Sequence, residues 1–259
     1  MSDGTDLLAF LSQSTNRAEI LKLLRDEEGL DRYEIGEQVE VSRRTVIRTL
    51  NTLTEHGCVA ESDGSYRLTA FGSVLIESYQ RFAEETELAS DLAPFLTHMP
   101  DGVLDLDLQH FEDAELITAT EGSPYAVLDR TLAIRRQASE IRELSPIIEQ
   151  KSIAQLAQRI RNGEPVSVEV VLSESALEAS EIHPDYQEHQ QLVSQADQTD
   201  IYLASIDIPF LLCIADDTVA IGVTNDGKPH ALVVSTNADV KQWAEQTYET
   251  YQEHVQQVE

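Results

Sequence analysis

Three side chains that can hydrogen-bond to DNA bases recur at helical spacing near the N-terminus. Arg44, Arg48 and Asn51 are spaced i, i+4 and i+7, so they share one face of a helix. An arginine guanidinium pairs bidentately with guanine, and an asparagine amide with adenine, in a major groove that admits a helix. The pattern therefore predicts a helix that reads DNA bases. Aliphatic side chains at the same spacing fall almost opposite and predict its buried face: Val46, Leu50 and Leu53.

The residues around this helix predict a helix-turn-helix. Asp31 is placed to cap a first short helix, and Glu34, three residues on, completes a capping box. Ser42 caps the second helix, which ends at the stop signal Gly57. The base-reading helix thus follows the first helix after a tight turn.

A hairpin follows and completes a winged helix over residues 31–68. Residues 59–62 and 65–68 flank Asp63-Gly64, a strong signal for a tight turn between two strands. The predicted DNA-contacting residues lie at the start of the second helix, on its outward face and in the wing: Ser42, Arg43, Arg44, Thr45, Arg48, Asn51 and Arg67. The alternative is a winged helix that contacts protein instead of DNA.

The run VSRRTVIRTLNTLTEHGCV, followed by a short hairpin and RLTAFG, resembles the winged helix of archaeal and bacterial transcription regulators of the ArsR, MarR and TrmB kind. The resemblance covers roughly residues 5–90. It implies double-stranded DNA as the partner. It also implies a homodimer that places two recognition helices in successive major grooves, about 34 Å apart.

The net charge of the chain, −29, opposes DNA binding except at this helix. Residues 1–90 hold 9 basic and 17 acidic residues, a net of −8, and residues 91–259 hold 9 and 30, a net of −21. Residues 42–56, by contrast, hold three arginines and one glutamate. The local charge therefore becomes positive where DNA is expected to lie.

The basic residues comprise fourteen arginines and four lysines. Abundant acid with little lysine resembles the proteins of salt-in halophiles such as haloarchaea. In molar salt the Debye length is about 3 Å, which screens the global repulsion and also weakens the counterion-release contribution to DNA binding. We therefore expect a halophilic archaeal protein that depends on base contacts and shape rather than on a broad basic patch.

Composition favours a cytoplasmic protein. The chain starts with no apolar leader, and no apolar run approaches the ~18 residues that span a bilayer. Cys58 and Cys213 provide neither a disulfide framework nor a thiolate metal cage. Cys58 is expected to be a small core residue, with a redox sensor as the alternative.

Two segments lead out of the winged helix. Thr69 is expected to cap a helix over residues 70–89, whose apolar stripe either packs on the winged helix or forms a dimer contact. That stripe comprises Val74, Leu75, Tyr79 and Phe82. The expected domains are a DNA-binding domain with its connecting helix, a proline-containing linker, and a domain for effector sensing and dimerisation: residues 1–90, 91–110 and 111–259.

Strands and helices alternate from Glu115 onward, which predicts an α/β domain. Repeated β-α units imply a mainly parallel sheet covered by helices, with an antiparallel meander added near the C-terminus. The expected strands are residues 116–119, 141–144, 166–172, 201–204, 210–215, 218–223 and 231–235. The expected helices are residues 124–137, 152–161, 175–181, 184–196 and 238–258, the last capped by Asn237.

The order of these elements resembles the effector domain of archaeal regulators. These include the TrmB sugar regulators, whose sensor domain is similar to half of phospholipase D, and the middle domain of the methanogen filament regulators. The resemblance covers about residues 110–259. No histidine is followed two residues later by lysine, so the phosphodiesterase signature of phospholipase D is missing.

Small polar residues follow the predicted strands, where ligands bind in open α/β sheets. Gly122 and Ser123 precede a predicted helix N-terminus whose free N–H groups favour an anion, and Arg130 or Arg135 lies on that helix. We expect a small polar or anionic metabolite at this rim, although such residues also suit ordinary caps and turns. The expected effector-binding residues are Glu121, Gly122, Ser123, Tyr125, Arg130, Ser145 and Ser173.

Other chemistries find little support. His183 and His189 are six residues apart, unlike the i, i+4 pair of a helical metal site, and no nucleophile elbow, Walker loop or dinucleotide fingerprint occurs. We therefore predict no metal, no cofactor and no enzyme activity. The prediction is a DNA-binding transcription regulator, repressor or activator, with a protein-binding or ligand-sensing module as the alternative.

Overall fold

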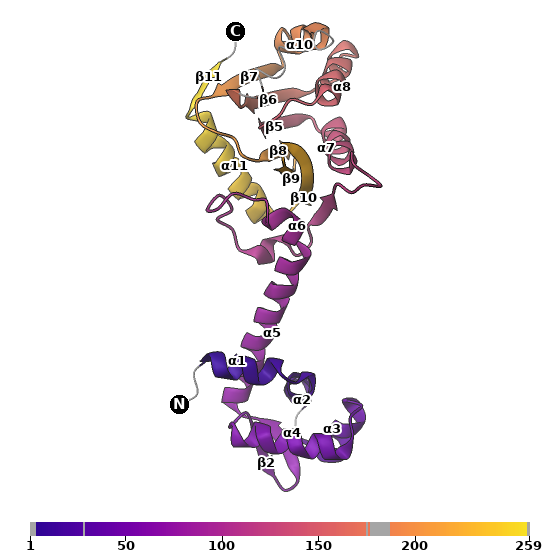
Figure 1. Cartoon of the computed structure of the whole chain (residues 1–259), viewed down its shortest axis with the longest axis vertical. Helices are drawn as coiled ribbons and strands as arrows, with labels where there is room; N and C mark the ends of the chain where they lie inside the picture. The colour runs from indigo at the N-terminus through magenta and orange to yellow at the C-terminus, as the bar shows by residue number, and fades with distance from the viewer. Residues whose placement is uncertain (1–3, 28, 175, 177–186, 258–259) are drawn as a thin grey trace. The chain divides into compact units, whose positions relative to one another are not determined.

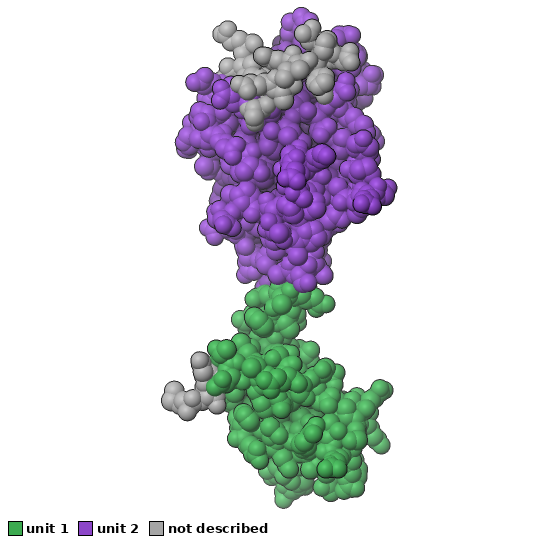
Figure 2. Space-filling view, in the orientation of Figure 1, with its two compact units in different colours: residues 1–87 green, residues 88–259 purple. Residues whose placement is uncertain are grey.

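The computed structural model describes residues 4–27, 29–174, 176 and 187–257. The chain divides into two compact units, residues 1–87 and 88–259, and this boundary falls within helix α5 (Ala70–Asp91) (Figure 1 and Figure 2). No helix of the described residues combines the length and apolarity needed to cross a membrane.

The first unit has the predicted winged-helix architecture. Its three-stranded sheet has the order β1-β3-β2, and its helices enclose a core that includes the aliphatic face of α4. The elements are α1 (Gly4–Ser12), α2 (Thr15–Asp26), β1 (Leu30–Asp31), α3 (Arg32–Gln38), α4 (Arg43–Glu55), β2 (Val59–Ser62), β3 (Ser65–Leu68) and the first part of α5.

Local hydrogen bonds explain where these elements begin. The Asp31 carboxylate accepts from the backbone N–H groups of Tyr33 and Glu34 at 2.6 and 3.0 Å. The Glu34 carboxylate accepts from the Asp31 N–H at 2.7 Å, which completes the predicted capping box. Asp63 and Gly64 have φ values of 52° and 80°, as a tight hairpin turn requires.

The start of α5 is joined to the end of α4. The Thr69 hydroxyl accepts from the Gly72 N–H at 2.9 Å, as predicted for a cap, and donates to the Gly57 carbonyl at 2.7 Å. A Cβ on Gly72 would lie 2.0 Å from the Cys58 carbonyl oxygen, so only glycine fits there. The helix α4 and the start of α5 are therefore fixed to each other within this unit.

The second unit is built on an eight-stranded mixed sheet with the order β11-β7-β6-β5-β8-β9-β10-β4. Its strands are β4 (Glu115–Thr118), β5 (Glu140–Ser145), β6 (Ser167–Leu172), β7 (Thr199–Ala204), β8 (Leu211–Ala215), β9 (Thr218–Asn225), β10 (Lys228–Ser235) and β11 (Val255–Gln257). Its helices are α6 (Ala93–Leu96), the 3-10 turn η1 (Leu108–Phe111), α7 (Ala126–Gln137), α8 (Gln150–Arg161), α10 (Gln187–Ser194) and α11 (Ala238–Gln252).

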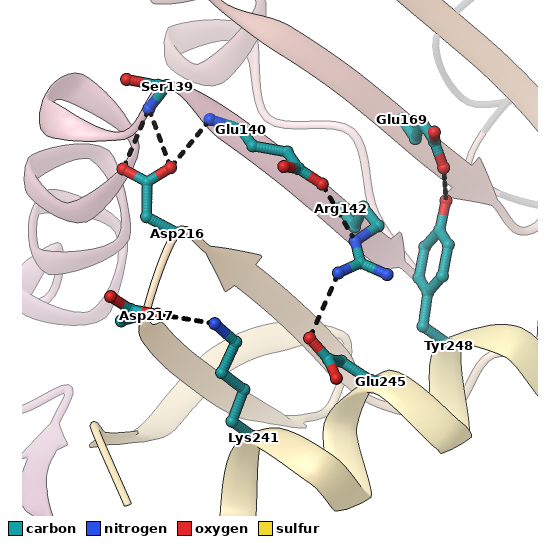
Figure 3. A network of polar contacts seen from close by, with 9 residues as sticks. All are labelled: Ser139, Glu140, Arg142, Glu169, Asp216, Asp217, Lys241, Glu245 and Tyr248. Atoms are coloured by element: carbon teal, nitrogen blue, oxygen red, sulfur yellow. Dashed lines mark hydrogen bonds and ion pairs between the residues drawn. The ribbon is translucent and has the colours of Figure 1, made fainter. Parts of the chain in front are cut away.

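The prediction of a mainly parallel sheet was wrong. Of the seven neighbouring strand pairs described, β5–β6 and β6–β7 are parallel and five are antiparallel. The meander β8–β10 lies between β4 and β5, and tight turns such as the one at Asp216 join antiparallel neighbours only. Asp216 has φ 52°, and its carboxylate accepts from the N–H groups of Ser139 and Glu140 at the start of β5 (Figure 3).

Helices cover both faces of this sheet. α11 lies on one face, over a core that includes Phe210, Trp243 and Tyr248, whereas α7, α8 and α10 lie on the other (Figure 1). On the α11 face Arg142 donates to Glu245 at 3.3 Å, and the Tyr248 hydroxyl donates to Glu169 at 3.3 Å (Figure 3). Burial and the nearby Glu169 carboxylate raise the pKa of Tyr248, so it stays protonated as a donor.

Two segments differ from their predictions. Residues 91–110, expected as a linker, contribute Leu92, Phe95 and Met99 to the buried core of the second unit, because these apolar side chains cover the sheet. The last helix ends at Gln252 rather than 258, and β11 pairs with the exposed edge of β7. Apart from Ala176, the expected helix over residues 175–181 lies outside the described residues, as does the start of that over 184–196.

Both cysteine thiols should resist alkylation in the folded protein. Cys58 and Cys213 are fully buried, and burial raises the pKa of each thiol, which lowers the fraction of reactive thiolate. At pH 8 we expect iodoacetamide to modify the native chain at least about 100-fold more slowly than the urea-unfolded chain, as followed by mass spectrometry. Rapid labelling of native Cys58 would support the redox-sensor alternative instead.

Candidate nucleic-acid interface and expected effector rim

The outward face of α4 presents the predicted base-reading side chains. Arg44, Arg48 and Asn51 are exposed. The opposite face is buried completely, with Val46, Leu50 and Leu53 all at 0% exposure. Since one face is committed to the core, the orientation of the arginine row is set by packing and not by its own contacts.

Two of the predicted contact residues form the start of the helix. The Ser42 hydroxyl accepts from the Thr45 N–H at 3.3 Å and lies 2.9 Å from the Thr45 hydroxyl. The Ser42 hydroxyl is therefore already partly engaged in capping α4. These two residues position α4, and any contact with DNA by their hydroxyls shares atoms with the cap.

An aromatic residue that the sequence analysis missed lies beside this face. Tyr33, on α3, is 51% exposed. The guanidinium carbon of Arg43 lies 4.9 Å from the centroid of its ring, and that of Arg32 lies 5.3 Å from it. Both guanidinium groups therefore lie within cation–π distance of one exposed ring. In the sequence, the signal for this contact is the pair Arg32-Tyr33 at the start of α3, the first helix of the helix-turn-helix.

The wing presents Arg67 outward. Tyr66 and Leu68 pack against the core, and because side chains alternate along a strand, the exposed Arg67 between them points away. The wing also carries an acidic side chain, Glu61. Burial and then this nearby carboxylate raise the pKa of Tyr66. A single wing arginine therefore sits in a locally acidic hairpin.

The expected effector rim does not form one site. β4 and β5 point the same way, but β8, β9 and β10 lie between them. At ~4.8 Å per strand the residues after β4 lie about 19 Å from those after β5. Ser145 and Ser173 do lie side by side after the adjacent strands β5 and β6, with the Ser173 N–H donating to the Ser145 carbonyl at 3.2 Å, but the residues after β4 are separated from them.

The side chains expected to bind an anion already have partners. Arg130 donates twice to the Glu115 carboxylate, at 2.7 and 2.9 Å. Arg135 forms a buried ion pair with Glu143. The Ser123 N–H donates to the Thr120 hydroxyl at 3.2 Å within a turn, three residues before α7 begins, so this N–H group is already engaged.

The remaining rim residues divide into exposed and buried ones. Glu121, Gly122 and Tyr125 are exposed in the loop before α7. Ser173 is buried and donates to the Pro146 carbonyl at 3.2 Å. Ser145 is also buried, but it lines a cavity on the α7, α8 and α10 face of the sheet. Of the metal alternative, His183 lies outside the described residues.

Family models match most of the chain. Residues 124–254, which are 131 of the 259 residues, match the family described as "Methanogenesis regulatory protein FilR1, middle domain". Residues 5–91 match the family described as "HVO_A0261 N-terminal domain". No curated protein sequence matches the chain.

Several solved structures are similar to parts of the chain. An archaeal chromatin protein, TrmBL2, reported to show a novel mode of DNA binding, is 14% identical with a TM-score of 0.40 over 98% of this chain and 99% of its own. A MarR family protein of Mycobacterium tuberculosis is 26% identical with a TM-score of 0.29 over 34% of this chain and 69% of its own. Phosphatidylserine synthase of Haemophilus influenzae is 10% identical with a TM-score of 0.41 over 56% of this chain and 39% of its own. These scores are low, and no functional conclusion follows from them.

Proposed function

This chain belongs to the family described as "Methanogenesis regulatory protein FilR1, middle domain", and from that premise we propose that it is a sequence-specific, DNA-binding transcription regulator. The observation that carries the proposal is the exposed row of Arg44, Arg48 and Asn51 on a helix whose other face is fully buried. A helix held in this way can enter the major groove and present its row to base edges. Such a regulator acts in the cytoplasm, with the DNA.

The test is selection of a binding sequence. The full chain is incubated with a library of random duplex DNA at several KCl concentrations, and bound DNA is sequenced after each round. We expect one motif to be enriched, with guanine or adenine at the positions that α4 faces. Failure to enrich any motif, together with stoichiometric capture of one protein partner, would support the alternative of a protein-binding module.

We further propose that the regulator is a homodimer formed through α5. Phe71, Val74 and Phe82 are exposed by 46%, 63% and 54%. At 100° per residue these positions fall within an arc of about 80°, a mainly apolar stripe that also carries Ser78 and Glu85. Leu75 and Tyr79, expected in the same stripe, pack instead into the core of the first unit. A second copy of α5 suits the exposed stripe, because a two-fold axis places like side chains together.

Placing charge on this stripe should produce a monomer. We expect Val74→Glu with Phe82→Glu to halve the mass measured by light scattering and to weaken binding to a two-half-site operator at least about tenfold, because four carboxylates cannot share an apolar contact. Ala83→Glu, which adds a carboxylate to another exposed position of α5, is the matched control and should remain dimeric. An unchanged mass for the double variant would place the dimer interface elsewhere.

The acidic surface supports a protein adapted to high salt. With a net charge of −29, self-repulsion destabilises the folded chain at low ionic strength, and salt screens it. We expect the melting temperature to rise by about 10 °C or more between ~0.1 and ~2 M KCl, measured by circular dichroism. A melting temperature that stays constant or falls with KCl would argue against a halophilic protein.

The second unit completes the proposed regulator as a sensor. The order of its strands and helices resembles half of phospholipase D, but we propose that this unit serves ligand binding rather than catalysis. A ligand that binds one DNA-affinity state better than the other shifts the equilibrium between them. The proposal therefore requires a small-molecule site in residues 88–259.

A further inference from the structure

A cavity of about 560 Å³ lies on one face of the sheet in the second unit. Strands β5, β6, β7, β8 and β9 contribute its floor, and α7, α8 and α10 contribute its walls. Small-molecule sites in proteins typically enclose about 300–1,000 Å³. The cavity is therefore large enough for a metabolite, and it lies apart from Glu121, Gly122, Ser123 and Tyr125 of the expected rim.

The walls of the cavity are mainly apolar. Leu128 and Leu156 face it from α7 and α8, and Val170 and Ile201 face it from adjacent positions of β6 and β7. Gly222 adds no side chain to the floor, where a Cβ would lie 3.1 Å from Leu211. An apolar ligand body would thus replace water against aliphatic carbon, which is favourable.

Among the residues that the structure describes, one polar side chain of the cavity has no hydrogen-bond partner. Thr199, at the start of β7, is 8% exposed, and its hydroxyl oxygen forms no hydrogen bond among the described residues. A buried hydroxyl without a partner is unfavourable. The Thr199 hydroxyl oxygen is itself buried, and rotation about χ1 would turn the hydroxyl toward the cavity in place of the methyl group. A ligand hydroxyl or carbonyl would supply the missing hydrogen bond.

The charges around the cavity disfavour an anion. Arg135 and Glu143 neutralise each other in a pair whose side chains are 6% and 7% exposed. The nearby Glu149 carboxyl also lines the cavity, and burial raises its pKa. A ligand carboxylate or phosphate would lose solvation in the same surroundings without an uncommitted cation among the described lining residues, whereas an uncharged ligand avoids that cost.

We propose that this cavity binds an uncharged, mainly apolar small molecule that carries one hydroxyl or carbonyl group, which hydrogen-bonds to Thr199. The site and its ligand class replace the polar or anionic rim expected from the sequence. Binding itself does not depend on the proposed DNA-reading function. The role of the ligand as an effector does rest on that function.

Three naphthalene probes of similar size test the ligand class. The full chain, without DNA, is titrated with 2-naphthol, 2-methylnaphthalene and 2-naphthoate, and binding is followed by probe fluorescence. We expect one equivalent of 2-naphthol to bind, with 2-methylnaphthalene about 3- to 10-fold weaker because it lacks the hydrogen bond, and 2-naphthoate weaker still. Tightest binding by 2-naphthoate, or no binding by any probe, would overturn the proposal.

Two variants locate the site. Thr199→Val keeps the side-chain volume, and it should abolish the preference for 2-naphthol over 2-methylnaphthalene without loss of stability. Val170→Phe fills the cavity and should weaken both probes at least about tenfold, provided that its melting curve shows a folded chain. Thr250→Val, on α11, removes a hydroxyl that bonds the Gln246 carbonyl away from the cavity, and it should leave binding unchanged.

The outcomes separate this proposal from the regulatory one. If Thr199→Val retains the 2-naphthol preference, the assignment of Thr199 is overturned even when Val170→Phe fails to fold. Probe binding without any enriched DNA motif would leave the cavity assigned and refute the DNA-reading function. An enriched motif without probe binding would support the DNA-reading function and refute the cavity assignment.

Discussion

Replacing Arg44 and Arg48 together by alanine is expected to abolish sequence-specific DNA binding while leaving the fold intact. Both side chains are exposed on α4, opposite a face that is completely buried. Each bidentate contact between arginine and guanine contributes about 1–3 kcal/mol of discrimination. The pair should therefore lower the affinity for the selected motif by about 2–6 kcal/mol per protomer, which is at least roughly 30-fold.

A matched variant separates base reading from general charge. Arg81→Ala with Arg136→Ala also removes two exposed arginines, and so lowers the net charge of −29 by the same two units. Electrophoretic mobility shifts on the selected motif and on a scrambled duplex should show a specific loss only for Arg44→Ala with Arg48→Ala. Equal losses in the two double variants would mean that charge, rather than base contacts, controls binding.

The wild-type melting curve is the second control, because alanine favours helices and the core face of α4 is untouched. Footprints of the Arg44, Arg48 double variant that match those of the wild type would refute the assignment of α4 as the reader. A further arm, Arg48→Lys, keeps the charge but not the planar fork of donors. It should lose most of the discrimination if the contact is bidentate.

Replacing Glu143 by alanine should destabilise the second unit by about 3 kcal/mol or more. Glu143 on β5 pairs with Arg135 on α7, and their side chains are 7% and 6% exposed. Removing the carboxylate leaves a guanidinium buried without its counter-charge, and breaking such pairs costs about 3–5 kcal/mol. Because the pair lines a cavity, water can reach the arginine in part, which favours the lower end of that range.

Urea unfolding followed by circular dichroism measures this effect. Glu115→Ala is the matched control: its partner Arg130 and Glu115 itself are 36% and 53% exposed, so the loss should be at most about 1 kcal/mol. Replacing both members of the buried pair, Arg135→Met with Glu143→Leu, should restore most of the lost stability because no charge remains buried. Equal losses for Glu143→Ala and Glu115→Ala would show that the buried pair is well solvated.

The winged helix could be predicted closely because its signals are local. Asp31, Ser42 and Thr69 begin their helices through hydrogen bonds that span two or three residues, and Asp63-Gly64 turns the hairpin at its expected place. The 3.6-residue period of the aliphatic side chains of α4 also determines which face is buried. Interactions of this kind join residues that are close in the sequence, so the sequence alone is enough to predict them.

The sheet of the second unit shows where such reasoning ends. Most of its strands were expected near their observed positions, yet their order was not, because pairing depends on contacts between distant segments. The insertion of β8–β10 between β4 and β5 separated the expected rim residues. On one face of this sheet, α7, α8 and α10 enclose a cavity whose lining includes the pair Arg135–Glu143 and the side chain of Thr199.

By itself, the sequence determined the helix α4 with its buried and exposed faces, its cap, the wing that follows it and the sparse positive charge in an acidic chain, because each depends on residues within about one or two helical turns. The tertiary structure alone decided the order of the strands, the place of Tyr33 beside Arg43, and the cavity lined by Thr199. These features join side chains from separate elements. Their positions follow from how the elements pack, which no local period or motif encodes.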